Sequence, residues 1–167
     1  KEATAHAALA DVLALSGQPA AAITSYEQAL NLDADVALDY ELVGQQYRRL
    51  GRNDEAIAAF DKALVHEPGK LSVYLGLADA YLAEGRTGQA VSAYEEALVQ
   101  APADSMALLG LGRALLQGGQ AQTALDKFAQ ASAGGADQVT VLLGQGAALT
   151  ALRRDDEAIT AFERASE

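Results

Sequence analysis

The stretch RNDEAIAAFDKA at residues 52–63 returns later in the chain as RDDEAITAFERA at residues 154–165. The two copies lie 102 residues apart, which is three times 34. Between the two copies, the same pattern of Ala, aromatic residue and Ala occurs at both intermediate 34-residue steps, and it also occurs one step before the first copy. No insertion or deletion interrupts it. The aromatic residues of the five copies are Tyr26, Phe60, Tyr94, Phe128 and Phe162. A fixed period of this length indicates stacked helix pairs.

One unit, residues 37–70, shows how the pairs are built. Its apolar residues recur at helical spacing before Gly51 and again between Gly51 and Pro68. Glycine accepts the left-handed conformation that ends a helix, and proline cannot continue the hydrogen-bond ladder. The unit therefore predicts two amphipathic helices joined by a tight turn. The fifth unit has Arg153 in place of the turn glycine, so we expect a different or strained turn there; the equivalent glycines are Gly17, Gly51, Gly85 and Gly119.

Composition agrees with a helical domain. The chain has 167 residues, half of them apolar, which is enough for one continuous core over residues 1–167. Three prolines and many alanines favour helix over sheet. The absence of cysteine excludes disulfides and thiolate metal sites. No apolar run approaches the roughly 20 residues that span a bilayer, so we expect no transmembrane segment. Because the first residue is Lys1 rather than Met, we expect a fragment or a processed product.

The pattern resembles the tetratricopeptide repeat (TPR) family. The residues that carry the resemblance are the Leu-Gly or Leu-Ala pairs of the first helices, the turn glycines, the alanines and aromatics of the second helices, and Pro68 and Pro102. The resemblance implies an all-α, right-handed superhelix, an α-solenoid of about five helix-turn-helix repeats in a single domain. The repeats are residues 3–36, 37–70, 71–104, 105–138 and 139–167, the last one truncated.

The sequence argues against several other functions. All nine aromatic residues fall at repeat signature positions, so we interpret them as core and find none left for stacking on bases. A net charge of −11 disfavours nucleic acid, because phosphate binding requires a basic surface. His6 and His66 have no second ligand at helical spacing. We therefore expect no catalytic residue, no metal site and no cofactor, and we interpret the chain as non-enzymatic.

The resemblance also implies where a partner binds. In such repeats the first helices line a concave groove, and repeat positions 2, 5, 6, 9, 12 and 13 point into it. This wall is mostly apolar, so we expect it to bind an apolar or amphipathic segment, with Arg49 and Arg113 fixing an acidic group of the partner. The candidate partner-binding residues are Leu38, Leu42, Gln45, Arg49, Leu75, Gly76, Asp79, Leu82, Leu109, Gly110, Arg113, Leu116, Leu143 and Gly144.

A Leu-Gly pair recurs at positions 5 and 6 of three repeats, as in Leu75–Gly76. Glycine inside a helix costs about 0.5 to 1 kcal/mol relative to alanine, so its repetition needs a reason. One interpretation is a lowered groove floor that lets a partner approach closely. The other is that neighbouring helices need small residues to stack, or that duplication copied a harmless glycine. The sequence leaves these interpretations open.

The leading functional hypothesis is a protein-binding scaffold that acts as an assembly factor of a bacterial secretion or pilus machine. The chain resembles the envelope TPR lipoproteins that assist secretins and tight-adherence pili, which favours the bacterial periplasm or outer-membrane attachment over the cytoplasm. Its asparagines, Asn31 and Asn53, do not match the TPR subclass that clamps the C-terminal carboxylate of heat-shock chaperones. The alternatives are weak self-association through the C-terminal repeat, where Ile159 and Phe162 lack a capping helix, and a regulatory module of a larger enzyme.

Overall fold

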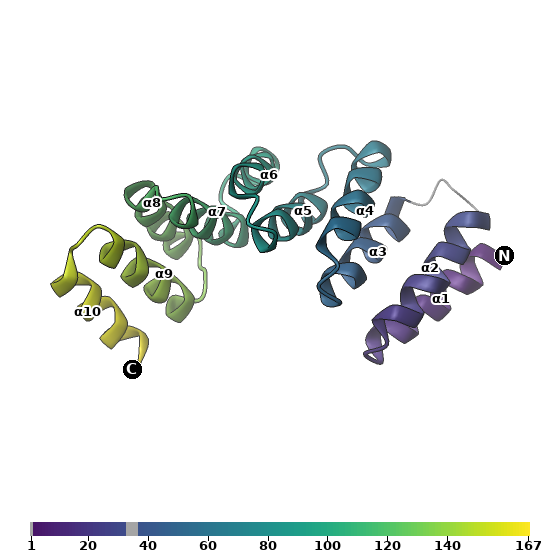
Figure 1. Ribbon diagram of the computed structural model, residues 1–167, viewed down its shortest axis with the longest axis horizontal. Coiled ribbons are helices and arrows are strands. Elements are labelled where there is room, and N and C mark those ends of the chain that lie inside the picture. Colours follow the sequence, from purple (N-terminus) through teal and green to yellow (C-terminus); the bar gives the residue numbers. More distant parts are fainter. Residues whose placement is uncertain (1, 33–36) are drawn as a thin grey trace. The chain divides into compact units, whose positions relative to one another are not determined.

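The computed structural model describes residues 2–32 and 37–167, with the side chains of residues 37–39 outside the description. Every regular element in these residues is a helix, so the prediction of an all-α fold is confirmed (Figure 1). The helices are α1 (Glu2–Leu15), α2 (Pro19–Leu32), α3 (Ala37–Arg49), α4 (Asn53–His66), α5 (Leu71–Ala83), α6 (Thr87–Gln100), α7 (Ser105–Gln117), α8 (Ala121–Ala133), α9 (Gln138–Ala151) and α10 (Asp155–Ala165).

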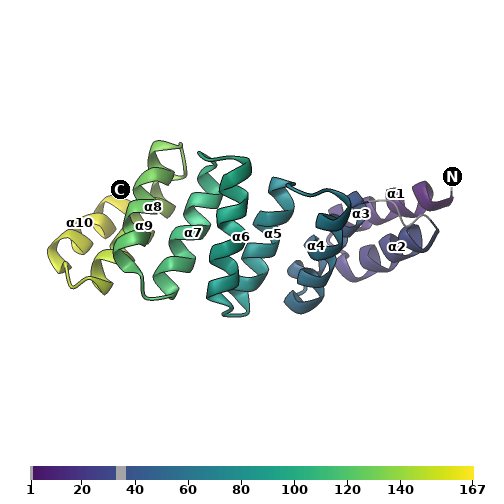
Figure 2. The same cartoon turned by 90° about the horizontal axis from the view of Figure 1, so that it is seen from above.

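The helices form two compact units, Lys1–Glu84 and Gly85–Glu167. In the N-terminal unit α1 packs on α2 and α3 on α4, while α2 also contacts α3 and α4 contacts α5. In the C-terminal unit α7 packs on α8 and α9 on α10, with further contacts from α6 to α7 and from α8 to α9 (Figure 2). The helix starts follow the predicted repeat boundaries, since α3, α5 and α7 begin at the first residue of a repeat. The single continuous domain over residues 1–167 stays a prediction.

The turns inside the helix pairs repeat one geometry. Gly17, Gly51, Gly85 and Gly119 all have a positive φ between 70° and 78°. Arg153 takes the same place in the fifth repeat with a φ of 60°, which confirms the expected strain, because a side chain in this region clashes with the backbone. The backbone N–H of Arg154 still donates to the carbonyl of Leu149, at 3.0 Å. The turn is therefore kept at the expense of an unfavourable arginine conformation.

The core is built around one aromatic residue in each second helix. Tyr26, Phe60, Tyr94 and Phe128 are almost fully buried, whereas Phe162 in α10 is 41% exposed. Phe60 lies between two glycines, Gly44 of its own repeat and Gly76 of the next. Phe128 lies in the same way between Gly112 and Gly144. Phe60 and Phe128 thus each join a helix pair to the first helix that follows it.

The interpretation of all nine aromatics as core is too broad. Tyr40, Tyr47, Tyr74 and Tyr81 in the first helices are only half-buried. The hydroxyl of Tyr47 donates to the carboxylate of Glu27 at 2.9 Å, and burial, followed by this bond, raises the pKa of Tyr47. The ring of Tyr40 stacks on His66 with the centroids 5.7 Å apart. Tyrosine suits such boundary positions because its ring can pack while its hydroxyl reaches polar groups or water.

Candidate functional site

The candidate residues lie on the first helices of the repeats, and we call repeat positions 2, 5, 6, 9, 12 and 13 of α3, α5, α7 and α9 the first-helix face. Among the candidates, Arg49, Arg113 and Leu143 are exposed, and Gly76 and Gly110 are buried. The half-buried candidates are Leu42, Gln45, Leu75, Asp79, Leu82, Leu109, Leu116 and Gly144. Leu38 belongs to α3, but its side chain lies outside the described residues.

The glycines at position 6 have a structural explanation. A Cβ atom on Gly144 would lie 2.7 Å from the ring of Phe128, and one on Gly110 would collide with the ring of Tyr94. In each case the ring belongs to the second helix of the preceding repeat rather than to a neighbouring first helix. This geometry favours the interpretation that the glycines are needed for packing. The group that needs the space is an aromatic ring of the preceding repeat.

In the C-terminal unit the first-helix face carries exposed apolar side chains. Leu143 of α9 is 49% exposed, and Met106, at position 2 of α7, is 68% exposed. Leu109 and Leu116 add half-buried leucines to the same face of α7. These side chains offer contacts to an apolar partner, since a buried leucine contributes about 1.5 to 3 kcal/mol.

In the N-terminal unit the same face carries an ion-pair network. Arg48 of α3 pairs with Asp79 of α5 at 2.9 Å. Lys70, just before α5, pairs with the buried Glu41 at 3.1 Å and with Glu67 at 2.7 Å. The hydrogen bond to Glu67, and then the one to Glu41, raises the pKa of Lys70. Sequence reasoning omitted Arg48 and Glu41 from the candidates, although their positions, 12 and 5, belong to the face.

Arg49 is tied to the preceding repeat. Its Nη1 donates to the backbone carbonyl of Ala14 in α1 at 3.2 Å and to Oε1 of Gln46 at 3.4 Å. Gln46 is almost fully buried, so it offers a fixed acceptor. A cavity of about 310 Å³ lies beside this contact and is lined by Gln45, Arg48 and Arg49. The structure thus brings two of the candidates, Gln45 and Arg49, together with Arg48, which is on the same face but not among the candidates.

A second cavity of the N-terminal unit lies away from the first-helix face. It has about 420 Å³ and is lined by α2, α3 and α4, among them Leu30, Tyr40, Val43 and Tyr47. Lys62 of α4 lies over the Tyr40 ring, with its Nζ 5.5 Å from the centroid. The described residues that line this cavity also include the carboxylates of Glu27 and Glu55.

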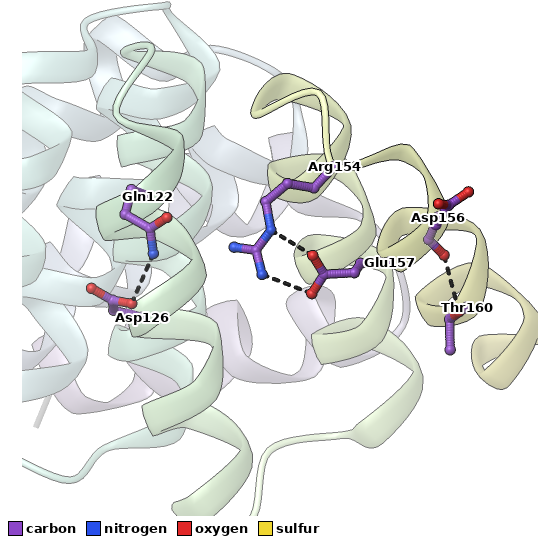
Figure 3. A network of polar contacts seen from close by, with 6 residues as sticks. All are labelled: Gln122, Asp126, Arg154, Asp156, Glu157 and Thr160. Carbon is purple, nitrogen blue, oxygen red and sulfur yellow. Dashed lines mark hydrogen bonds and ion pairs between the residues drawn. The ribbon is translucent and has the colours of Figure 1, made fainter.

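Several exposed side chains at the start of α10 are polar. Arg154 donates through Nε and Nη2 to the carboxylate of Glu157, both at 2.7 Å (Figure 3). One turn further, the hydroxyl of Thr160 donates to the backbone carbonyl of Asp156 at 3.0 Å. Ile159 lies between these polar residues in sequence and is 55% exposed, which makes α10 a helix with both polar and apolar exposed residues.

The described residues contain neither a cluster of metal ligands nor a membrane-spanning helix. No group of three or more His, Asp and Glu side chains in residues 2–32 and 37–167 is placed to hold a metal ion. Within the same residues, no helix has the length and apolar character needed to cross a membrane.

Comparisons with known proteins agree with the repeat assignment. Two family models, both described as tetratricopeptide repeat, match residues 42–105, 75–138 and 109–167, and residues 3–36. No curated protein matches the chain as a close relative in sequence.

Solved structures share the fold at low sequence identity. A MamA structure is 20% identical with a TM-score of 0.89, covering 98% of this chain and 90% of that one. MamA 41-end from Desulfovibrio magneticus RS-1 is 17% identical with a TM-score of 0.94, covering 99% and 94%. YrrB, described as a TPR protein with an unusual peptide-binding site, is 21% identical with a TM-score of 0.81, covering 96% and 82%. These likenesses establish the α-solenoid fold of helix-turn-helix repeats.

Proposed function

Because the chain belongs to the tetratricopeptide repeat family, we propose that it is a non-catalytic scaffold that binds an apolar or amphipathic segment of a protein partner on its first-helix face. The observation that carries this proposal is the set of large apolar side chains that this face leaves open to solvent. Met106 and Leu143 are the most exposed of them. YrrB, a structurally similar TPR protein, is described as having an unusual peptide-binding site, which supports a peptide segment as the partner.

The leucines rather than the charges supply most of the affinity in this proposal. An exposed ion pair contributes at most about 1 kcal/mol, whereas burying one leucine contributes about 1.5 to 3 kcal/mol. Binding should therefore depend only weakly on salt concentration.

We further propose that the scaffold is an assembly factor of a bacterial secretion or pilus machine and works in the periplasm or attached to the outer membrane. The support for this role is the resemblance of the repeat pattern to envelope TPR lipoproteins. Cell fractionation of the native host tests it, since recovery of the protein in the cytoplasmic fraction alone contradicts an envelope role.

The binding proposal is tested with a random library of twelve-residue peptides displayed on phage. Peptides that bind the immobilised chain are synthesised, and their dissociation constants are measured by fluorescence anisotropy. Two double variants remove leucines from one unit each, Leu42→Asp with Leu75→Asp and Leu109→Asp with Leu143→Asp. Glu95→Ala on α6 is the control on a second helix.

We expect at least one double variant to weaken binding by about tenfold or more while its helicity by circular dichroism stays unchanged. The Glu95→Ala control should bind as the unmutated chain does. A library that yields no binding peptide contradicts the proposal, and so does equal binding by both folded double variants and the unmutated chain.

A second role is favoured by one specific observation. We also propose that the chain self-associates weakly through α10, because Phe162 and Ile159 are exposed there while the equivalent aromatics of the other repeats are buried. An exposed apolar cluster of this kind is typical of an interaction surface.

A further inference from the structure

We propose that copies of this chain associate head to tail, with the exposed apolar side of α10 in one copy packing against an exposed apolar side of α1 in the next copy. This inference rests on the proposed self-association through α10 and names the surface that α10 contacts. We call that surface the α1 stripe, and its residues are Ala5, Ala8, Leu9 and Val12.

The α1 stripe is one continuous apolar side of a helix. Its residues follow each other at steps of three, one and three positions, which places them on the same side of an α-helix. All four are exposed, and the two largest, Leu9 and Val12, are 50% and 63% exposed. Ala10 and Ala14 of the same helix are instead buried in a core cluster with α2. The stripe is therefore apolar surface that the packing of α1 on α2 leaves open.

The same repeat positions are buried in first helices that follow another repeat. The α1 stripe occupies repeat positions 3, 6, 7 and 10. In α5 and α7, each of which contacts the second helix before it, every residue at these positions is buried. These residues are Val73, Gly76, Leu77 and Ala80 in α5, and Ala107, Gly110, Leu111 and Ala114 in α7. The α1 stripe is thus the side by which a first helix of this chain contacts a preceding repeat.

The other half of such a junction is exposed on α10. Each second helix has a branched apolar residue at repeat position 21 and an aromatic residue at position 24. In α10 these are Ile159 and Phe162, which are 55% and 41% exposed. In the other second helices the aromatic residue is almost fully buried and the branched residue is buried or half-buried. The branched residues there are Ile23, Ile57, Val91 and Leu125.

Alanine at position 6 of α1 is compatible with an aromatic ring opposite it. The junction of α8 with α9 leaves no room for a Cβ atom between Phe128 and Gly144. The junction of α2 with α3 is different, because Leu42 occupies position 6 there and Tyr26 is still only 1% exposed. Junctions of this chain therefore adjust to the side chain at position 6, and Ala8 lies in size between the two observed cases.

The nature of the two surfaces favours α10 on α1 over α10 on a second α10. Inside the units, the rings of Phe60, Tyr94 and Phe128 all pack against a following first helix. A contact of α10 with α10 would leave the α1 stripe exposed, whereas head-to-tail association covers both apolar surfaces. Because the two surfaces differ, each added copy brings one free surface of each kind, so growth continues beyond a dimer unless a ring closes.

The test is sedimentation velocity of the 167-residue chain and of variants that block one surface each. Val12→Lys blocks the α1 stripe, and Ile159→Lys blocks α10. Val65→Lys on α4 is the control, because Val65 is 77% exposed and belongs to neither surface. The runs use about 0.15 M salt, which screens the repulsion between copies of net charge −11 beyond about 8 Å. Circular dichroism verifies the helicity of each variant.

We expect the unmutated chain and Val65→Lys to form species larger than a dimer as the concentration rises. Val12→Lys and Ile159→Lys should each stay monomeric at the same concentrations, because a buried lysine weakens the contact by about tenfold or more. An equal mixture of these two variants should form a heterodimer and nothing larger. The mixture keeps one intact pair of surfaces, α10 of the Val12→Lys copy and the α1 stripe of the Ile159→Lys copy.

The failures of the two proposals are distinguishable. If Val12→Lys dimerises alone while Ile159→Lys stays monomeric, self-association through α10 stands and the head-to-tail contact is wrong. A mixture that contains only monomers also overturns the head-to-tail contact. If both variants associate as the unmutated chain does, neither surface is used and both proposals fail. Ala8→Glu is a second variant that blocks the α1 stripe, and it replaces Val12→Lys in these comparisons if that variant loses helicity.

Discussion

A Cβ atom on Gly76 of α5 would lie 2.6 Å from Cζ of Phe60 in α4, closer than any ordinary carbon contact. Phe60 is fully buried, so its ring has no free space into which it could move. Glycine at this position therefore lets the first helix of one repeat close over the aromatic ring of the repeat before it. The same relationship between Gly144 and Phe128 recurs two repeats later.

The first prediction is that Gly76→Ala destabilises the N-terminal unit. Overpacking a filled core costs about 1 to 3 kcal/mol, which exceeds the about 0.5 to 1 kcal/mol that alanine gains over glycine within a helix. We expect a lower urea midpoint. Gly88→Ala on α6 is the matched control, because no atom lies within 4 Å of its Cβ position, and it should leave stability unchanged or raise it. A Gly76→Ala midpoint at or above that of the unmutated chain would show that the interface yields to the added methyl group.

The second prediction concerns the strained turn between α9 and α10. Arg153 has a φ of 60°, a region that disfavours side chains by about 1 to 2 kcal/mol. Arg153→Gly relieves this strain, and the larger freedom of glycine in the unfolded chain offsets part of the gain. We expect a net stabilisation of about 0.5 to 1 kcal/mol in urea titrations. The reverse change, Gly119→Arg in the equivalent turn of the fourth repeat, should destabilise, and a stabilising outcome there would contradict the explanation.

The turn glycines and Arg153 show which features of the fold can be predicted from the sequence. The 34-residue period gives helix boundaries and turns because both follow from local residue types, such as glycine where the backbone must turn left-handed. The period even identifies Arg153 as the turn that differs. The helix pairs and the buried rings of the second helices are predicted for the same reason, since each repeat solves the same packing problem.

The site is predicted less completely because its contacts join residues far apart in the sequence. Arg49 reaches the carbonyl of Ala14, and Arg48 pairs with Asp79, so neither contact is visible in a local pattern. Glu41 is buried although carboxylates usually lie at the surface, and its partner Lys70 lies at the far end of the same repeat. The sequence does not show why glycine recurs at position 6, because the aromatic ring that requires it belongs to the preceding repeat.

The third prediction is a pH dependence at the start of α9. Asp137 caps this helix, accepting from the hydroxyl of Thr140 at 2.7 Å and from its backbone N–H at 2.8 Å. These bonds, that of the hydroxyl first, lower the pKa of Asp137. A lowered pKa means that the cap stabilises the fold above the ordinary aspartate pKa of about 3.9 and loses this effect as the pH falls through the folded value.

Asp137→Ala should therefore lower the melting temperature at neutral pH, and its difference from the unmutated chain should shrink below about pH 4 and vanish at lower pH. Asp137→Asn is the control, since asparagine caps helices as well but does not titrate. It should melt near the unmutated chain at neutral pH. A difference between the alanine variant and the unmutated chain that stays constant down to strongly acidic pH would rule out the titration of Asp137 as its cause.

The last prediction concerns self-association through α10. Phe60, Tyr94 and Phe128 are each covered by a glycine of the first helix that follows, as Phe128 is by Gly144. Phe162 contacts Gly146 of its own repeat, but none of the described residues covers its other side, and Ile159 is exposed beside it. Burying two such side chains against another copy yields a few kcal/mol before the entropy of association is subtracted, which fits weak binding.

Sedimentation velocity should accordingly show an average mass that rises with concentration for the unmutated chain. Ile159→Lys is the cleaner variant, because Phe162 also packs within its own repeat, and it should remain monomeric with unchanged helicity. Val99→Lys on α6 is the control, since Val99 is also apolar and is even more exposed but lies on another helix, and it should associate as the unmutated chain does. If the unmutated chain stays monomeric at every concentration, the chain does not self-associate. If Ile159→Lys associates as strongly as Val99→Lys, the contact does not use α10. Either result contradicts the proposal.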